Sequence, residues 1–383
     1  MHSGLMPERP APLVLVTTPA AGQPFGTHAA IAADGQRLLA TELSRRLGAL
    51  GAAVRPLPAV SPDGFHWGRW FTDAARTAIA DAASSGAAVD AIGYAGGGTM
   101  ALLPDDGLDH LLSPVFGEAV ANNRFSADAF VVAGDLDRAL DALTACDSDN
   151  AAARRLEEAG FVVRDLGTTP WARFDVDTTL DLALLRLATR LPETRPLGQA
   201  VRGYLEMARL PGDRGLEVPH LAAIGDVMRD RSAELVVAGR VPATTWAELE
   251  TETACRVRCF VEERGMRSAR GESGSRPRSI LAVLMDRTSP TELVQALADL
   301  GDAVVLDTRV LTATVAGSAA ADRWPPEEER FASDFGDVSR IGTPWLRELT
   351  EAAASSSTPF LFGGHALVSD GLRLIVAAAW QGR

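Results

Sequence analysis

The stretch VDAIGYAGGGT, residues 89–99, combines the two features that decide the expected fold. Its first six residues form a short apolar run that is typical of a buried strand, and this run leads directly into three glycines. Comparable runs lie at residues 12–18, 52–57, 127–133 and 161–166, with helical patterns between them. Strands that alternate with helices at this spacing predict an α/β fold whose mostly parallel sheet is covered on both faces.

The loops that follow these strands are the first candidates for a binding site, because ligands of parallel sheets bind at the carboxyl ends of strands. We therefore expect the loops after Thr18, after Tyr94 and near Asp175 to meet at one edge. The glycines of these loops allow a ligand to approach the backbone closely. They are Gly22 and Gly26 after the first strand, and Gly96, Gly97 and Gly98, with Thr99, after the third. A tight turn without a ligand explains the same glycines.

The amino-acid composition limits the classes of protein to which this chain can belong. A chain of 383 residues, 46% hydrophobic and 23% charged, predicts a globular protein of two domains, without a membrane span or a signal peptide. The net charge of −13 argues against nucleic acid as a partner. Three cysteines form no disulfide framework, which favours a reduced, cytoplasmic protein. All 37 basic residues are arginine, so a bound phosphate must be held by arginine, backbone amides or metal.

The pattern divides the chain into three parts. Residues 1–190 form the first α/β domain, and residues 191–278 are mostly helical and act as a connector. Residues 279–383 form a smaller C-terminal α/β domain of unknown role. The connector ends in residues 268–278, a Gly/Ser/Arg-rich segment that fits a linker or a loop that grips phosphate.

The segment RFDVDTTLDL, residues 173–182, carries the strongest chemical signal. If residues 174–176 end a strand, Asp175 and Asp177 point to the same side and can share a divalent ion. Thr178 or Thr179 is then a natural N-cap, with Asp181 in the first helical turn. The alternative is that Asp177 and Asp181 only cap the helix.

Two further polar groups are candidates. Asn122, Asn123 and Arg124 could bind a base or a sugar, and Asp128 could be a further metal ligand or a solvated turn residue. In the C-terminal part, Asp307 and Arg309 lie within an apolar run that we expect to be one strand, where buried charges must pair or line a cleft. His365 follows two glycines at another strand end, so it is catalytic or structural.

Over residues 12–190 the chain resembles the nucleotidyltransferase superfamily with a GT-A-like, Rossmann-like fold. The nearest members are the guanylyltransferases of molybdenum-cofactor and deazaflavin-cofactor biosynthesis. The resemblance rests on the Gly22–Gly26 loop, which a helix follows, and on the acidic segment at residues 174–182. It implies a Mg²⁺-dependent enzyme in which Asp175, Asp177 and Asp128 hold the metal.

We therefore expect an enzyme that transfers a nucleotide from a nucleoside triphosphate to a phosphorylated small molecule, and a homodimer is compatible with this expectation. The nucleotide would lie on the Gly22–Gly26 loop, on Gly96–Thr99 and on Asn122–Arg124. Two alternatives remain. A non-catalytic nucleotide- or sugar-binding relative is favoured by the absence of arginine and lysine between Gly22 and Gly26, and by the lack of a carboxylate after Gly96–Thr99 before Asp105. A hydrolase or transferase would use Asp307, Arg309 and His365 in the C-terminal domain.

Overall fold

The chain divides into two compact units, which are described separately. The computed structural model describes residues 11–19, 26–58, 65–192, 194–195, 197–262, 279–317 and 324–381. Unit 1 comprises Met1–Ala20 and Leu39–Ala172, and unit 2 comprises Ala21–Leu38 and Arg173–Arg383. Unit 2 is therefore the larger one, contrary to expectation, and its C-terminal segment begins at residue 173 rather than near residue 190.

Unit 1 is built on a six-stranded sheet with the order β2-β1-β3-β5-β4-β6. The strands are β1 (Leu13–Val16), β2 (Ala53–Pro56), β3 (Ala91–Ala95), β4 (Glu118–Ala121), β5 (Ala129–Ala133) and β6 (Val162–Asp165). Only β5 runs against its neighbours; the other pairings are parallel. The expected α/β class is confirmed, but the sheet is mixed. Strand β4 was not predicted, because its four residues are too few to show a periodic pattern.

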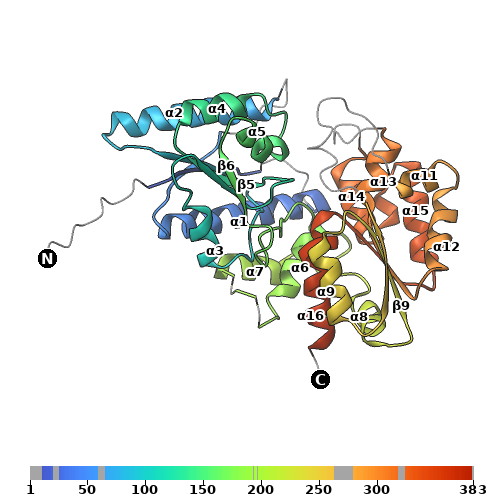
Figure 1. Cartoon of the computed structure of the whole chain (residues 1–383). Helices are drawn as coiled ribbons and strands as arrows, with labels where there is room; N and C mark the ends of the chain where they lie inside the picture. Colours follow the sequence, from blue (N-terminus) through green and yellow to red (C-terminus); the bar gives the residue numbers. More distant parts are fainter. Residues whose placement is uncertain are drawn as a thin grey trace. The chain divides into compact units, whose positions relative to one another are not determined.

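Helices cover both faces of this sheet (Figure 1). They are α2 (Trp67–Ser84), α3 (Asp105–Leu111), α4 (Leu136–Thr144), α5 (Ala152–Glu158), the 3-10 turn η1 (Asp149–Ala151) and the later part of α1 (His28–Ala49). Strand β1 shows why both faces need cover, because all four of its residues are buried. Leu13 and Leu15 pack into one core with Phe71, whereas Val14 and Val16 pack into another with Leu47. This alternation follows from the two-residue period of a strand.

Unit 2 is built on a four-stranded sheet that is parallel throughout, with the order β10-β9-β11-β12. Its strands are β9 (Glu234–Gly239), β10 (Arg256–Val261), β11 (Ala303–Asp307) and β12 (Phe360–Gly363), and a separate small hairpin pairs β7 (Arg209–Leu210) with β8 (Arg214–Gly215). Residues 191–278 are thus not a helical connector, since they supply two strands of this sheet. The run at residues 235–238 is buried on both faces, and a short apolar run of this kind does not distinguish strand from helix.

Helices of unit 2 surround the four-stranded sheet. They are α6 (Thr179–Ala188), α7 (Gln199–Met207), α8 (Leu221–Arg229), α9 (Ala243–Glu252), α11 (Ile280–Met285), α12 (Pro290–Ala298), α13 (Thr308–Val315), α14 (Glu327–Asp334), α15 (Pro344–Ser355) and α16 (Leu372–Trp380), with the short turns η3 (Val338–Arg340) and η4 (Leu367–Gly371). The early part of α1 also belongs to this unit. No helix within the described residues is both long enough and apolar enough to cross a bilayer. Residues 268–278, the expected linker or phosphate loop, lie outside the described residues.

In both sheets the first strand has the second strand on one side and the third strand on the other, so the strand order reverses at the first strand. The chain goes from β1 to β2 on one side and returns to β3 on the other. It goes likewise from β9 to β10 and then returns to β11. A point where the strand order reverses leaves a crevice outside the carboxyl ends of the two central strands. We call these two places, which lie at the carboxyl ends of central strands and not at the lateral edges of the sheets, the β1/β3 edge and the β9/β11 edge.

Candidate functional sites

The β1/β3 edge is formed by Thr17 and by the glycine loop after β3. The backbone N–H of Gly97 donates a hydrogen bond to Thr17 Oγ1 at 3.0 Å. The N–H of Gly96 donates to the carbonyl oxygen of Asp128 at 2.8 Å. The loop is thus fixed to β1 on one side and to the residue before β5 on the other.

Thr99 closes this loop with an unsatisfied hydroxyl. Gly97, Gly98 and Thr99 are all buried, and Thr99 is only 2% exposed. Its Oγ1 atom has no hydrogen-bond partner among the described residues. Met100, the next residue, has a left-handed backbone with φ of 56°. A buried hydroxyl without a partner is uncommon in folded proteins, so this one is a candidate ligand contact.

The polar segment after β4 mainly holds the fold together. Asn122 is fully buried; its side chain accepts a hydrogen bond from the Ala129 N–H at 3.0 Å and donates one to the Ala172 carbonyl at 3.2 Å. Asn123 accepts from the backbone N–H of Phe125 at 3.2 Å. The exposed Arg124 forms an ion pair with Glu157. The amide of Asn122, expected to contact a nucleotide, is therefore engaged with backbone.

The carboxylates expected to bind metal do not lie in one unit. Asp128 belongs to unit 1, where Ser126 Oγ donates to its Oδ1 at 3.1 Å. Asp175 and Asp177 belong to unit 2. Asp105 begins α3 and pairs with Arg46, whose Nε lies 2.8 Å from Asp105 Oδ1. Within the described part of the chain, no cluster of three or more His, Cys, Asp or Glu side chains is arranged to hold a metal ion.

The first glycine loop is only partly described. Gly22 lies outside the described residues, whereas Gly26 has φ of +75°, a conformation that glycine adopts readily. Thr27 Oγ1 accepts a hydrogen bond from the Ala30 N–H at 3.1 Å. Helix α1 begins at His28, two residues after Gly26.

Asp175 and Asp177 do not end a strand; Asp175 forms only an isolated bridge. Phe174 and Val176 are buried, while Asp175 is half-buried and Asp177 is exposed. Burial alternates along residues 174–177, which is the pattern of a strand. The chain pairs too briefly to form a strand, since helix α6 begins at Thr179.

Thr178 and Asp181 form a capping box at the start of α6, which confirms the predicted N-cap. Thr178 Oγ1 accepts from the Asp181 N–H at 3.2 Å, and Asp181 Oδ2 accepts from the N–H groups of Asp177 and Thr178 at 3.0 and 2.8 Å. Asp181 is thus a helix cap, whereas the carboxylate of Asp177 takes no part in this box. Asp181 is also 1% exposed, and its Oδ1 has no partner within the described residues. Burial and the nearby Asp177 raise the pKa of Asp181 to about 7.

The β9/β11 edge is closed by an ion pair between Asp307 and Arg240. Asp307 is the last residue of β11 and is fully buried. Arg240 Nε and Nη2 donate to its two carboxylate oxygens at 2.6 and 3.0 Å. Burial alone would raise the pKa of Asp307, but Arg240 holds this pKa below its usual value. Gly239 permits the approach: a Cβ atom there would lie 2.2 Å from Asp307 Cβ.

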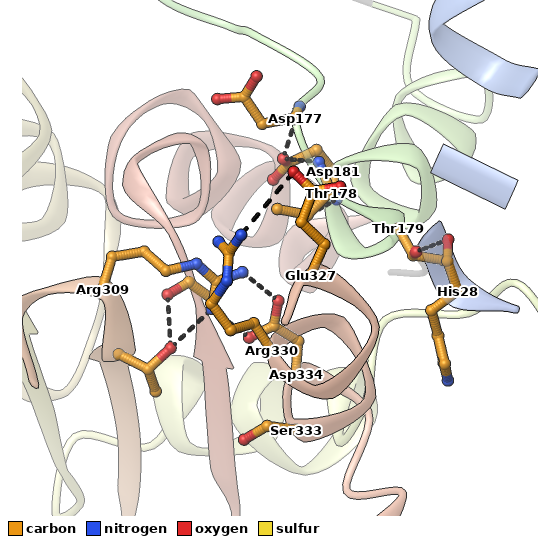
Figure 2. A network of polar contacts seen from close by, with 12 residues as sticks. His28, Asp177, Thr178, Thr179, Asp181, Arg309, Glu327, Arg330, Ser333 and Asp334 are labelled. Carbon is orange, nitrogen blue, oxygen red and sulfur yellow. Dashed lines mark hydrogen bonds and ion pairs between the residues drawn. The ribbon is translucent and has the colours of Figure 1, made fainter. Parts of the chain in front are cut away.

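Asp307 and Arg309 do not lie in one strand, which corrects the expectation. Asp307 is the N-cap of α13 and accepts from the Arg309 N–H at 3.2 Å. The Arg309 guanidinium instead binds Asp334 through two hydrogen bonds of 2.9 and 2.6 Å (Figure 2). Burial would lower the pKa of Arg309, but Asp334 raises it. His365 is half-buried after Gly363–Gly364, and its charge also helps to lower the pKa of Asp307.

Sequence reasoning missed Arg240 and Arg330 as members of these polar clusters. Recognising Arg240 required strand β9, whose end it follows. Arg330 comes from the segment EEER, residues 327–330, which is typical of a solvated helix start. Its side chain is nevertheless only 12% exposed. Burial and the positive charge of Arg309 lower the pKa of Arg330 to about 10.

In comparisons with protein-family models, with curated proteins and with solved structures, no match to this chain was found. The resemblance to nucleotidyltransferases therefore stays a prediction, and the two units must be interpreted from their own geometry.

Proposed function

We propose that the chain is a nucleotidyltransferase-like enzyme whose unit 1 binds a nucleoside triphosphate at the β1/β3 edge. The observation that carries this proposal is the glycine loop held by Thr17, with the buried, unpartnered hydroxyl of Thr99 at its end. The loop lies where the strand order reverses, the usual place for a ligand in such a sheet. In this assignment the Thr99 hydroxyl donates a hydrogen bond to a phosphate or ribose oxygen.

The proposed reaction transfers a nucleotide to a phosphorylated acceptor. A phosphate oxygen of the acceptor attacks the α-phosphorus of the triphosphate and forms a new P–O bond. The bond from the α-phosphorus to the bridging oxygen breaks, and pyrophosphate leaves with that electron pair. The protein contributes mainly by positioning the two reactants, as in other phosphoryl transfers.

The predicted Mg²⁺ does not fit the residues of either unit alone. Asp128 lies in one unit, Asp175 and Asp177 lie in the other, and the described residues form no three-membered donor group. Whether the reaction requires a metal ion is tested by including Mg²⁺ as a variable in the binding experiment.

The first test is thermal unfolding of the full chain with ATP, CTP, GTP or UTP, each with and without Mg²⁺. A ligand that binds only the folded state raises the melting temperature. We expect one nucleotide to do so, and we expect Thr99→Val to abolish most of this shift. Without ligand, Thr99→Val should unfold at the same or a higher temperature, because it removes a buried hydroxyl that has no partner.

Thr72→Val is the matched control. Thr72 is also a buried threonine of unit 1, but its hydroxyl is bonded to Arg69 and Thr144. This variant should lose stability and keep the nucleotide shift. The proposal is wrong if no nucleotide stabilises the protein, or if Thr99→Val leaves the shift intact. Transfer itself is tested by pyrophosphate release with a panel of phosphorylated acceptors.

A non-catalytic nucleotide-binding protein is the second candidate. It is favoured by Asp105, the first carboxylate after the glycine loop, which pairs with Arg46 rather than facing a ligand. Nucleotide-induced stabilisation that is lost in Thr99→Val, without pyrophosphate release from any acceptor, would support this candidate.

A further inference from the structure

Arg330 has a side chain that is mostly covered by the protein, yet its terminal nitrogens form no hydrogen bond with the described residues. Its Nε donates to the Pro325 carbonyl at 2.9 Å. Its Nη2 lies 3.8 Å from the nearest carboxylate, Glu327, which is 59% exposed. Neither terminal nitrogen makes a hydrogen bond to any residue that the structure describes. Such donors are normally bonded when a side chain is only 12% exposed.

Arg330 forms one long ion pair, with the exposed Glu327, and the buried carboxylate on its own helix is bound elsewhere. Asp334, the closest buried carboxylate on the same helix, is bound through both oxygens by Arg309. The guanidinium of Arg330 lies 5.5 Å from the ring centre of Trp324 and 5.6 Å from that of Phe331. These distances allow weak cation–π contacts, which leave the N–H donors of the guanidinium unused.

Asp181 supplies an unused acceptor in the same network. Its Oδ2 is committed to the capping box, whereas its buried Oδ1 has no partner among the described residues. Figure 2 shows Asp181, Arg309 and Arg330 gathered in one cluster, with Asp177 and Glu327 beside them. The cluster therefore combines guanidinium donors of Arg330, held only by a long ion pair, with the unpartnered acceptor of Asp181.

The position of this cluster in unit 2 fits a ligand site. Arg309 stands in the first turn after β11, one of the two strands that border the β9/β11 edge. Gly364, which follows β12, lies against it: a Cβ atom there would be 3.6 Å from Arg309 Cγ. Loops at the carboxyl ends of parallel strands are where such sheets bind small molecules.

We propose that unit 2 holds a second ligand site, in which Arg330 binds a small oxyanion and Asp181 accepts a hydrogen bond from a hydroxyl group of the same molecule. The oxyanion is a phosphate or a carboxylate, since a guanidinium binds either through two parallel hydrogen bonds. Arg309 keeps its pair with Asp334 and serves as the wall behind the anion. This site is independent of the nucleotide site proposed for unit 1.

The first experiment titrates the full chain with inorganic phosphate and follows thermal stability and heat of binding. We expect saturable stabilisation in the wild type, and an apparent Kd about tenfold higher or more in Arg330→Gln, as expected for the loss of a charge-assisted hydrogen bond. Arg330→Lys should bind at an intermediate level, because it keeps the charge but loses the planar fork. It also serves as the readout if Arg330→Gln fails to fold.

Arg347→Gln is the matched control. Arg347 also donates a single Nε bond to a backbone carbonyl, that of Ile341 at 2.7 Å, but it is exposed to water. Its replacement should leave phosphate binding unchanged. The same titration is repeated with acetate, and the proposal is wrong if neither phosphate nor acetate gives a saturable effect, because ordered water then suffices for Arg330. It is also wrong if both glutamine variants weaken binding equally, because the effect is then general charge screening.

The second experiment compares inorganic phosphate with glycerol 3-phosphate, and acetate with glycerate. The hydroxyl-bearing member of each pair should bind more tightly, and Asp181→Asn should remove this difference while phosphate binding persists. Binding of the phosphate pair would identify the oxyanion as a phosphate, and binding of the acetate pair would identify it as a carboxylate. Equal affinities within both pairs would overturn the role of Asp181. A nucleotide shift that is lost in Arg330→Gln but kept in Thr99→Val would refute the unit 1 proposal and leave the unit 2 site standing.

Discussion

The β1/β3 and β9/β11 edges share one topology but are built from opposite chemistry. At the β1/β3 edge the polar groups are neutral: a threonine hydroxyl holds a glycine amide, and a second hydroxyl is unpaired. At the β9/β11 edge two arginines are paired with two carboxylates, Asp307 and Asp334, which are fully buried. The order of strands determines where a ligand can bind, whereas the side chains at the edge determine what it can be.

The difference also predicts how much stability is lost when a residue of either edge is substituted. A neutral hydrogen bond contributes about 1 kcal/mol to stability, and its loss is tolerated. A buried ion pair that loses one partner leaves an uncompensated charge, which is far more costly. Single substitutions at the β9/β11 edge should therefore lower the stability of unit 2 strongly, whereas those at the β1/β3 edge should lower the stability of unit 1 only slightly.

The largest effect is expected for Arg309→Met. This change leaves Asp334 buried without its partner, and we expect the free energy of unfolding to fall by about 3–5 kcal/mol in urea denaturation. The double variant Arg309→Met/Asp334→Leu should recover much of this loss, because it replaces both charges with apolar groups. A loss below about 1 kcal/mol in the single variant would contradict the contrast between the two edges.

The next largest effect concerns pH and Asp370, in η4 after β12. Burial raises the pKa of Asp370 from 3.8 to about 6. The folded state therefore holds this proton more tightly than the unfolded state does. The resulting stability is fully present below pH 3.8 and is lost as the pH rises through about 6, a change of about 3 kcal/mol.

Asp370→Asn should flatten this part of the curve of unfolding free energy against pH. A remaining decline up to about pH 7 is assigned to Asp181. The exposed Asp299→Asn serves as the control and should keep the wild-type slope. Unit 1 should contribute nothing in this window from Tyr94 or Cys146, because burial raises the pKa of Tyr94 well above 10 and that of Cys146 to about 12. An Asp370→Asn variant that is less stable at pH 8 would show that the carboxylate acts as an ion-pair partner instead.

The smallest effect is expected for Thr17→Val at the β1/β3 edge. The substitution removes the acceptor of the Gly97 N–H and should cost about 1 kcal/mol. Hydrogen exchange should accelerate at the glycine loop while the four-stranded sheet of unit 2 remains protected. A loss as large as that of Arg309→Met would show that the two edges do not differ in the way described.

Several parts of the fold could be predicted from local pattern. The capping box at α6 was visible as Thr178 followed three residues later by Asp181, and strand β3 was visible as the apolar run before the three glycines. Strand β9 could not be distinguished from helix, because a run buried on both faces has no polar alternation. The run from β11 into α13 was misjudged because Asp307 is a helix cap, which ends a strand without any break in hydrophobicity.

The candidate sites show the same limit. The sequence alone determined the α/β class, the glycine loop after β3 and the absence of lysine, because these depend on composition and on neighbours a few residues apart. Only the tertiary structure decided that Asp307 pairs with Arg240 and Arg309 with Asp334. It also decided that the predicted metal ligands fall in different units. Ion pairing and burial depend on which distant segments the fold brings together, and no local pattern of residues encodes that.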